Sequence, residues 1–333
     1  MGGGVIPFVL RRVGWSIVVL LVASVVLFVF VRATTDPLAQ LRGSAVEGSD
    51  PARGRALIDA EQHRLGLDRP LASQYEHWLR RFVRGDWGES ILSHRSVAAE
   101  IRQRLWNTMQ LAVWAIGLSI AGAVSVGFAS AARRGSLVDH GLAGLAFLFL
   151  SMPPFWFALM AIEWLVYVPK NAFHLSQPLL FSVGAHSATG AGLLDYPRHL
   201  ALPVLTLSLP LVSSWSRYVR AAMLDELSAP YVRLARAKGL SRRTVLVRHA
   251  LRNALIPFTT ISALSIGYLF GGVIVVETIF AWPGMGQLLY NALLGGDTNV
   301  LLPWLVVAAT FVLVFNLAAD ILCGALDPRI RVA

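Results

Sequence analysis

The stretch VLLPWLVVAATFVLVFNLAA, residues 300–319, contains no charged side chain. A helix needs roughly 20 apolar residues to cross about 30 Å of hydrocarbon, so this stretch is long enough to span a bilayer. The rest of the chain has a similar character, since 56% of its 333 residues are hydrophobic and only 14% are charged. Soluble domains contain roughly 25% charged residues. A chain this apolar cannot bury its side chains in one water-soluble core, which predicts an integral membrane protein.

The apolar run that contains this stretch extends to about residue 325, past Asp320. Five further apolar runs approach the same length and cover residues 8–32, 106–131, 141–168, 199–221 and 257–281. The sequence therefore predicts an all-α membrane protein with six transmembrane helices. The first run is longer than the apolar part of a signal peptide, about 7–15 residues, so we expect a retained N-terminal helix over residues 1–32. Helix breakers interrupt several runs, as in transporters; they are Pro153, Pro154, Pro203, Pro210, Gly267, Gly271 and Gly272.

Charge in the loops predicts the orientation of these helices. Residues 222–256 hold seven Lys and Arg against two Asp and Glu, whereas residues 282–299 hold only Asp297. Short loops rich in Lys and Arg stay in the cytoplasm, so both termini and residues 224–256 are expected there. The net charge of +10 is thus explained by membrane orientation rather than by nucleic acid. Residues 33–105 hold eleven Arg and ten acidic residues, but loops longer than about 60 residues are translocated largely regardless of charge.

Residues 33–105 are therefore expected to form an extracytoplasmic segment between the first and second transmembrane helices. Apolar residues recur at helical spacing on both sides of a turn at residues 66–70. A second turn is expected at residues 85–88, followed by an interfacial helix that ends near Arg104. These signals predict a small appended domain, which precedes a five-helix core at residues 106–333.

The basic segment at residues 224–256 has signals for two short helices joined by a sharp turn. Gly239 suits the left-handed position just after a helix, and Ser241 can cap the next helix, which should run to about Ile256. Pro257 is then expected to open the fifth transmembrane helix. One face of the first helix is expected to be apolar, because three- and four-residue spacings separate Leu224, Leu227, Tyr231, Leu234 and Ala235.

The sequence of this segment resembles the cytoplasmic coupling loop of importer-type ABC permeases, which docks on a separate ATPase. The general pattern of that loop is only half kept around Gly239, but the variant of the dipeptide and oligopeptide branch is complete. That variant has Tyr-x-x-x-Ala-x-Ala-Lys-Gly-Leu followed by Arg-His-Ala-Leu-Arg-Asn-Ala-x-Ile-Pro. Stretches at residues 65–70, 84–88, 276–286 and 326–331 resemble the same branch. The resemblance implies that ATPase coupling depends on Tyr231, Ala235, Ala237, Lys238, Gly239, Leu240, Arg248 and His249.

The resemblance further implies a permease subunit in the inner membrane of a prokaryote. Such a subunit moves di- or oligopeptides delivered by an extracytoplasmic binding protein, beside a second, similar permease and two ATPase subunits. The chain contains no GxxxxGK[ST] loop, so ATP and magnesium are expected in the partner ATPases and no cofactor is expected here. We therefore expect a transport subunit rather than an enzyme.

Three residues are candidates for the translocation path or its gate: Glu163, Glu277 and Trp282. A charge inside the membrane is costly and needs a reason, but internal pairing would explain either glutamate as well as a contact with the peptide. Trp282 fits an interfacial or packing position equally well. Histidines 174, 186 and 199 match no ligand spacing, so no metal site is expected.

Other functions stay open at this point. The same machinery could import nickel or another small solute, although a nickel complex would favour His or carboxylate groups along the helices, and the histidines lie mostly in loops. An intramembrane hydrolase could use Glu163, Glu277 and histidine side chains, and it would be active as an isolated chain. A structural scaffold would leave the broken helices unexplained. The permease interpretation predicts instead that the isolated chain is inert.

Overall fold

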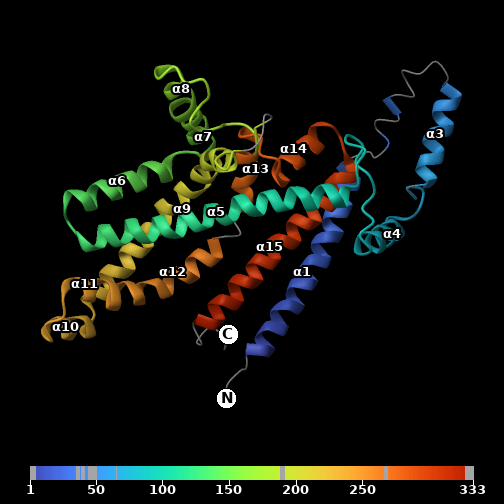
Figure 1. Ribbon diagram of the computed structural model, residues 1–333. Helices are drawn as coiled ribbons and strands as arrows, with labels where there is room; N and C mark the ends of the chain where they lie inside the picture. Colours follow the sequence, from blue (N-terminus) through green and yellow to red (C-terminus); the bar gives the residue numbers. More distant parts are fainter. Residues whose placement is uncertain are drawn as a thin grey trace. The chain divides into compact units, whose positions relative to one another are not determined.

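The computed structural model describes residues 5–34, 38, 42–43, 51–64, 66–187, 192–265 and 269–326. Within these ranges every regular element is a helix, and the single isolated β-bridge joins Glu89 to Ser96 (Figure 1). The prediction of an all-α chain is confirmed. The chain divides into two compact units. The core unit is chiefly Asn107–Gly286, and the small unit is chiefly Arg11–Trp106 with Gln287–Val314.

Four helices are long and apolar enough to cross a membrane: α1 (Val5–Thr34), α5 (Val97–Ala132), α9 (Asp195–Ser228) and α15 (Thr298–Leu326). A fifth crossing is present if the bent pair Leu137–Ser151 and Pro154–Ala172 counts as one span. The run predicted as the fifth helix is divided between α12 (Arg252–Ser265) and α13 (Leu269–Ile279). Residues 266–268 between them lie outside the described residues, so a count of six stays a prediction.

The prolines predicted to interrupt the helices act differently according to their spacing. At Pro153-Pro154 the chain turns by 103° between α6 (Leu137–Ser151) and α7 (Pro154–Ile162), because a residue that precedes proline is driven out of the helical conformation. The predicted span at 141–168 is therefore not one straight helix. Beyond α7 the chain continues through a π-helical turn, η1 (Glu163–Tyr167), into α8 (Val168–Ala172). Pro203 and Pro210 stand singly inside α9, which continues through both.

The amphipathic helix predicted after the turn at residues 66–70 is confirmed in α4 (Leu71–Val83), whereas the helix before the turn, α3 (Pro51–Arg64), has no marked apolar face. Helices α3 and α4 flank a turn in which Gly66 has a φ of 63°. The apolar face of α4 packs on α1 and α15, through a cluster that includes Phe28, Val31, Tyr75, Trp78, Phe82, Leu302 and Val306. Gly85 and Gly88 both have a φ of 79°, as expected for the second turn. The helix that follows does not end near Arg104, however, because α5 runs without a break from Val97 to Ala132.

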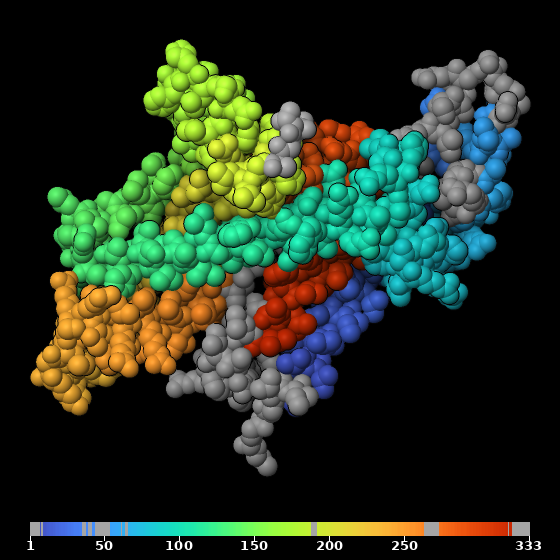
Figure 2. Space-filling view, in the orientation of Figure 1, coloured from blue at the N-terminus to red at the C-terminus, as the bar shows by residue number. Residues whose placement is uncertain are grey.

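The core unit is organised around α9, whose inner face is almost wholly buried. Two glycines of α5 allow close packing on it: a Cβ at Gly127 would lie 2.7 Å from the Ser216 carbonyl oxygen, and one at Gly122 would lie 2.8 Å from Val212. Trp215 of α9 and Phe258 of α12 meet edge to face, with ring centroids 5.8 Å apart. α9 therefore forms the frame from which the basic segment extends (orange in Figure 2).

Candidate functional site

The basic segment begins directly after α9. Ala229 leaves the helical conformation, with φ −63° and ψ 146°, and Pro230 then opens α10 (Pro230–Ala237). Proline is favoured at a first helical position because its missing N–H would have no partner there. The sequence prediction of a single helix through Leu224 and Ala235 is therefore wrong, since Pro230 divides it. We call residues 230–251 the basic knob.

A closed glycine turn ends α10. The Leu240 N–H donates to the Ala235 carbonyl (3.3 Å), and the Gly239 N–H donates to the Arg236 carbonyl (2.9 Å). This pair of bonds, with Gly239 at a φ of 79°, is the Schellman arrangement that satisfies the last carbonyls of a helix. The glycine turn predicted from the sequence is confirmed, and its backbone bonds make it stiff.

The second half of the knob starts at the predicted cap. The Ser241 hydroxyl accepts from the Thr244 N–H (3.3 Å) at the start of α11 (Arg242–Thr244). A π-helical segment, η2 (Val245–Leu251), follows and leads directly into α12. Pro257 lies inside α12 rather than at its start, so the expected boundary between the knob and the fifth helix is absent.

The buried face of the knob agrees only in part with the predicted apolar face, which included Leu227, Tyr231, Leu234 and Ala235. Val232, Ala235 and Val245 are buried together against Leu227, whereas Tyr231 and Leu234 are exposed, Leu234 by 56%. Of the residues expected to couple to an ATPase, Ala235 is buried within this chain and His249 is partly covered. The remaining six face solvent in this chain: Tyr231, Ala237, Lys238, Gly239, Leu240 and Arg248.

Tyr231 braces the knob from outside. Its hydroxyl donates to the Glu226 carboxylate at the end of α9 and accepts from Asn253 Nδ2 (2.7 Å) on α12. Partial burial, together with the bond to Glu226, raises the pKa of the Tyr231 hydroxyl. The side chain therefore ties α10 to the two helices on either side of the knob.

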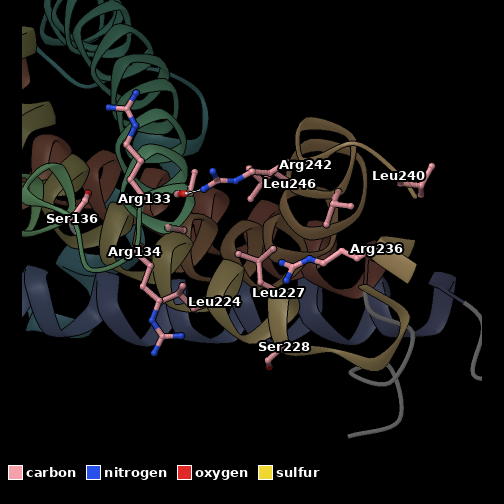
Figure 3. Close-up of a pocket in the computed structure, with 13 residues that line it drawn as sticks. Arg133, Arg134, Ser136, Leu224, Leu227, Ser228, Arg236, Leu240, Arg242 and Leu246 are labelled. Atoms are coloured by element: carbon pink, nitrogen blue, oxygen red, sulfur yellow. Dashed lines mark hydrogen bonds between the residues drawn. The ribbon is translucent and has the colours of Figure 1, made fainter. Parts of the chain in front are cut away.

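A cavity of about 800 Å³ lies beside the knob. Four arginines from the turn after α5 and from the knob are among its lining residues and are labelled in Figure 3: Arg133, Arg134, Arg236 and Arg242. Arg242 also donates to the Ala132 carbonyl at the end of α5 (2.6 Å), which fastens the knob to that helix. The knob is thus joined to α5, α9 and α12, so a force applied to it would reach three helices of the core unit.

An ion pair between a buried aspartate and a half-buried arginine lies near the same end of the core unit, and the sequence did not predict it. Both oxygens of Asp139 on α6 accept from Arg220 on α9, each at 2.8 Å. The Ser130 hydroxyl also donates to Asp139, and so does the Gly135 N–H (2.9 Å). The one available signal was Asp139 itself, an acidic residue just before the predicted run at 141–168 and close to Arg133 and Arg134.

A second candidate site surrounds Glu277 of α13, whose side chain is completely buried. One carboxylate oxygen accepts from the Thr108 hydroxyl (2.6 Å), and the other accepts from the Gly286 N–H (2.6 Å). Thr108 in turn accepts from the Met285 N–H (2.8 Å). We call Glu277, Thr108 and the turn at residues 282–286 the carboxylate clamp.

Tight packing encloses the clamp. Trp282 is 1% exposed and donates from its indole to the Asn107 carbonyl (3.2 Å). Asn107 Nδ2 donates back to the Pro283 carbonyl (2.7 Å). Glu277 and Trp282, two of the three residues predicted to serve the path or gate, thus hold one turn against α5. Glu163 is elsewhere, exposed at the start of η1.

No group of three or more His, Cys, Asp or Glu side chains in the described ranges is arranged to hold a metal ion. His199 instead stacks on Phe181, with ring centroids 4.4 Å apart, and its Nδ1 pairs with the Asp195 carbonyl (2.9 Å). His174 has a φ of 48° in the turn after α8.

The fold and the site together define a helical membrane protein that carries a stiff, basic, surface-exposed knob. The chain belongs to the family of binding-protein-dependent transport system inner membrane components, whose family model matches residues 123–332. The model of the N-terminal region of such membrane components matches residues 5–112. The chain is therefore a multi-pass inner-membrane transport subunit and not an enzyme, as the sequence predicted.

Several relatives match almost the whole chain, among them a dipeptide and an oligopeptide permease protein. The dipeptide transport system permease protein DppB of Escherichia coli (strain K12) is 36% identical over 342 residues, which cover 98% of this chain and 99% of the relative. The oligopeptide transport system permease protein OppB of Mycobacterium tuberculosis (strain H37Rv) is 34% identical over 338 residues, with the same coverage.

Among solved structures, the inward-facing MetNI methionine ABC transporter matches with a TM-score of 0.52. Its chain is 16% identical, and the match covers 68% of this chain and 96% of that one. At that identity the likeness supports the fold alone.

Proposed function

We propose that this chain is the permease subunit of an ATP-driven importer of di- or oligopeptides, and that the basic knob docks on a separate ATPase. The observation that carries the proposal is the closed turn at Gly239. Its hydrogen bonds are satisfied internally, yet the side chains of Lys238 and Leu240 around it are left exposed. A rigid backbone with an uncommitted surface is suited to receiving force from a partner. The relatives named for dipeptide and oligopeptide transport support the substrate class.

The proposed complex contains a second, similar permease, two ATPase subunits and an extracytoplasmic binding protein that delivers the peptide. ATP hydrolysis in the ATPases pushes the knob, and its attachments to α5, α9 and α12 pass the movement to the core unit. Both termini and the knob lie in the cytoplasm, and residues 33–105 lie outside. The positive charge of residues 222–256 supports this orientation.

The three candidate path residues are assigned two different roles, one in peptide contact and one in holding a turn. Glu163 is exposed on a π-helical turn inside an apolar helix pair, and π-helical turns recur at functional sites. It is therefore the candidate for contact with the peptide. Glu277 and Trp282 have buried side chains bonded to their neighbours, so we assign them to holding the shape of a gate turn.

The test replaces Gly239 by valine in cells that carry the complete transporter. A β-branched residue strains a backbone with φ of 79°, although no atom lies within 4 Å of an added Cβ. We expect uptake of a labelled dipeptide to fall about tenfold, the size of a typical coupling free energy, while the amount of subunit in the membrane stays constant.

Gly85→Val is the matched control, because Gly85 has the same φ and the same empty surroundings in the outer turn of the small unit. Unchanged uptake in Gly239→Val, or an equal loss in Gly85→Val, would refute the coupling role. Uptake of Ni²⁺, measured in the same cells, tests nickel as the alternative cargo. If the transporter imported nickel, the wild type would take up Ni²⁺ but no dipeptide, and Gly239→Val would reduce the uptake of Ni²⁺.

A further inference from the structure

The small unit contains a cavity of about 480 Å³ that the proposed function does not use. It lies among the last turn of α1, α4, the turn at residues 86–89 and the first turn of α15. Its lining combines aromatic, polar and charged side chains, among them Arg32, Gln74, Trp78, Phe82, Trp87 and Thr298. Such a mixture suits a ligand with a charged head and an apolar body.

Two polar atoms of this cavity lack partners. Among the described residues, only Gln74 Oε1 and Thr298 Oγ1 are buried side-chain atoms without a hydrogen bond, and both residues line this one cavity. The Gln74 amide nitrogen is already engaged, because it donates to the Leu67 and Arg69 carbonyls (3.2 and 2.8 Å). A buried polar group without a partner is costly, which indicates that something absent from the chain itself supplies the missing bonds.

Arg32 adds a charge that nothing in the described part of the chain neutralises. The guanidinium is half-buried and lies 5.4 Å from the centre of the Phe28 ring. Two acidic residues also line the cavity, Asp86 and Glu89. Asp86 is already bound by Arg81, with distances of 2.9 and 3.1 Å, and Glu89 lies on the wall without an ion pair to Arg32. An unpaired arginine at a cavity is suited to an anion, and phosphate is among the groups that its planar guanidinium binds best.

The walls of the cavity are aromatic and rigid. Trp78 stacks on Phe82, and Phe82 stacks on Trp87, with ring centroids 5.1 and 4.9 Å apart. The Trp87 indole N–H is used internally, since it donates to the Phe82 carbonyl (2.9 Å). These rings therefore offer apolar surface next to Arg32, as expected where a protein meets the boundary between water and lipid.

The position of the cavity along the membrane-spanning helices identifies the class of ligand. The candidate span of α1 ends at Thr34, and that of α15 begins at Thr298. Arg32 and Thr298 are therefore at the depth where phospholipid headgroups lie. A soluble anion would make no apolar contact with the aromatic walls. A phospholipid can place its phosphate at Arg32 and its glycerol and acyl carbons against the aromatic rings of the same site.

We propose that this cavity binds the phosphodiester headgroup of a membrane phospholipid. Arg32 pairs with the phosphate, the Thr298 hydroxyl donates to a phosphate oxygen, and Gln74 Oε1 accepts a hydrogen bond from the headgroup. Trp78 and Trp87 cover the glycerol and the first acyl carbons. The assignment to the outer leaflet rests on the proposed orientation of the chain, but the site itself does not depend on transport.

Native mass spectrometry of the purified, delipidated transporter tests the proposal, with a short-chain phosphatidylglycerol as the probe. We expect one saturable lipid per copy of this chain in the wild type. Arg32→Gln should weaken its binding about tenfold, because a charge-assisted hydrogen bond is lost. Thr298→Val should weaken lipid binding by a smaller factor. This second variant keeps the test possible if the Arg32→Gln transporter does not assemble. Arg80→Gln is the matched control, because Arg80 is exposed on α4 and paired with Glu76, and its lipid binding should equal that of the wild type.

Equal lipid binding in the wild type and in both cavity variants would overturn the proposal and leave water as the occupant of the cavity. Displacement of the lipid by millimolar inorganic phosphate would also overturn it, in favour of a site for a free anion. Neither outcome bears on peptide uptake, so a failure here is distinct from a failure of the proposed function.

Discussion

The basic knob and the carboxylate clamp both depend on glycine turns, but for opposite reasons. At Gly239 the backbone has a φ of 79° and an added Cβ would meet nothing within 4 Å, so the backbone alone requires glycine. At Gly284 the space is filled instead, since an added Cβ would lie 2.1 Å from Glu277 Oε1. The knob is stiff in its main chain and open at its surface, whereas the clamp is closed by its side chains.

This difference separates two tasks within the core unit. A surface that receives a partner must keep side chains uncommitted, and Lys238, Leu240 and Arg248 are exposed in this chain. A turn that must keep its shape inside a membrane protein needs every polar group bonded, because no water is available to replace a missing partner. Glu277 meets that requirement through Thr108 and Gly286. Substitutions in the clamp should therefore reduce stability, and substitutions in the knob should reduce transport at nearly unchanged stability.

The largest effect on stability is expected from Gly284→Ala. The added methyl group would overlap the buried Glu277 carboxylate, which cannot move without losing its bonds to Thr108 and Gly286. We expect a loss of about 3 kcal/mol in the free energy of unfolding, the upper range for overpacking. Thermal unfolding of the purified complex measures it as a lowered Tm.

Gly141→Ala is the control for that measurement. Gly141 lies within α6, where an added Cβ would meet nothing within 4 Å, and alanine is the better helix former by about 1 kcal/mol. Its Tm should equal or exceed that of the wild type. A Gly284→Ala variant as stable as the Gly141→Ala variant would show that the clamp is loosely packed and that the contrast with the knob is wrong.

A smaller loss is expected from Thr108→Val, which keeps the shape of the side chain and removes its hydroxyl. The Met285 N–H loses its acceptor and Glu277 loses one donor, at a cost of about 2 kcal/mol. Thr206→Val is the matched variant, because Thr206 is equally buried but its hydroxyl only bonds back to Leu202 in its own helix (2.9 Å). Equal destabilisation of the two variants would mean that the clamp bonds contribute nothing beyond burial.

The sequence predicted the parts of the knob that local chemistry determines. Gly239 and Ser241 were recognised because a helix end needs a left-handed residue and a helix start needs a side-chain acceptor, whatever surrounds them. The break at Pro153-Pro154 follows from the same kind of local restriction. The all-α class and the long apolar helices follow from composition and length.

Features that depend on distant contacts were not predictable in this way. Spacing placed Tyr231, Leu234 and Ala235 on one apolar face, and packing against Leu227 and Val245 does bury Ala235. It buries Val232 beside it, however, and leaves Tyr231 and Leu234 exposed. Thr108 carries no signal of its role, because its partner Glu277 is 169 positions further along the chain. Considered without its surroundings, Pro257 predicts the start of a helix. In the structure, however, η2 leads into α12 without a boundary.

We expect the smallest effect from Tyr231→Phe, which changes a single hydrogen-bonded hydroxyl at the surface of the knob. The raised pKa of Tyr231 means that the fold retains the hydroxyl proton more tightly than the unfolded chain, whose tyrosine titrates near 10.0. The contribution of the Tyr231 hydroxyl to the free energy of unfolding is therefore complete below pH 10 and declines as the pH rises further. Below pH 9 we expect the variant to be less stable by less than about 1 kcal/mol, because the partly exposed bond is screened by water. Above pH 10 the Tm curves of the wild type and the Tyr231→Phe variant should converge. Parallel curves would show that the Tyr231 hydroxyl does not brace the knob.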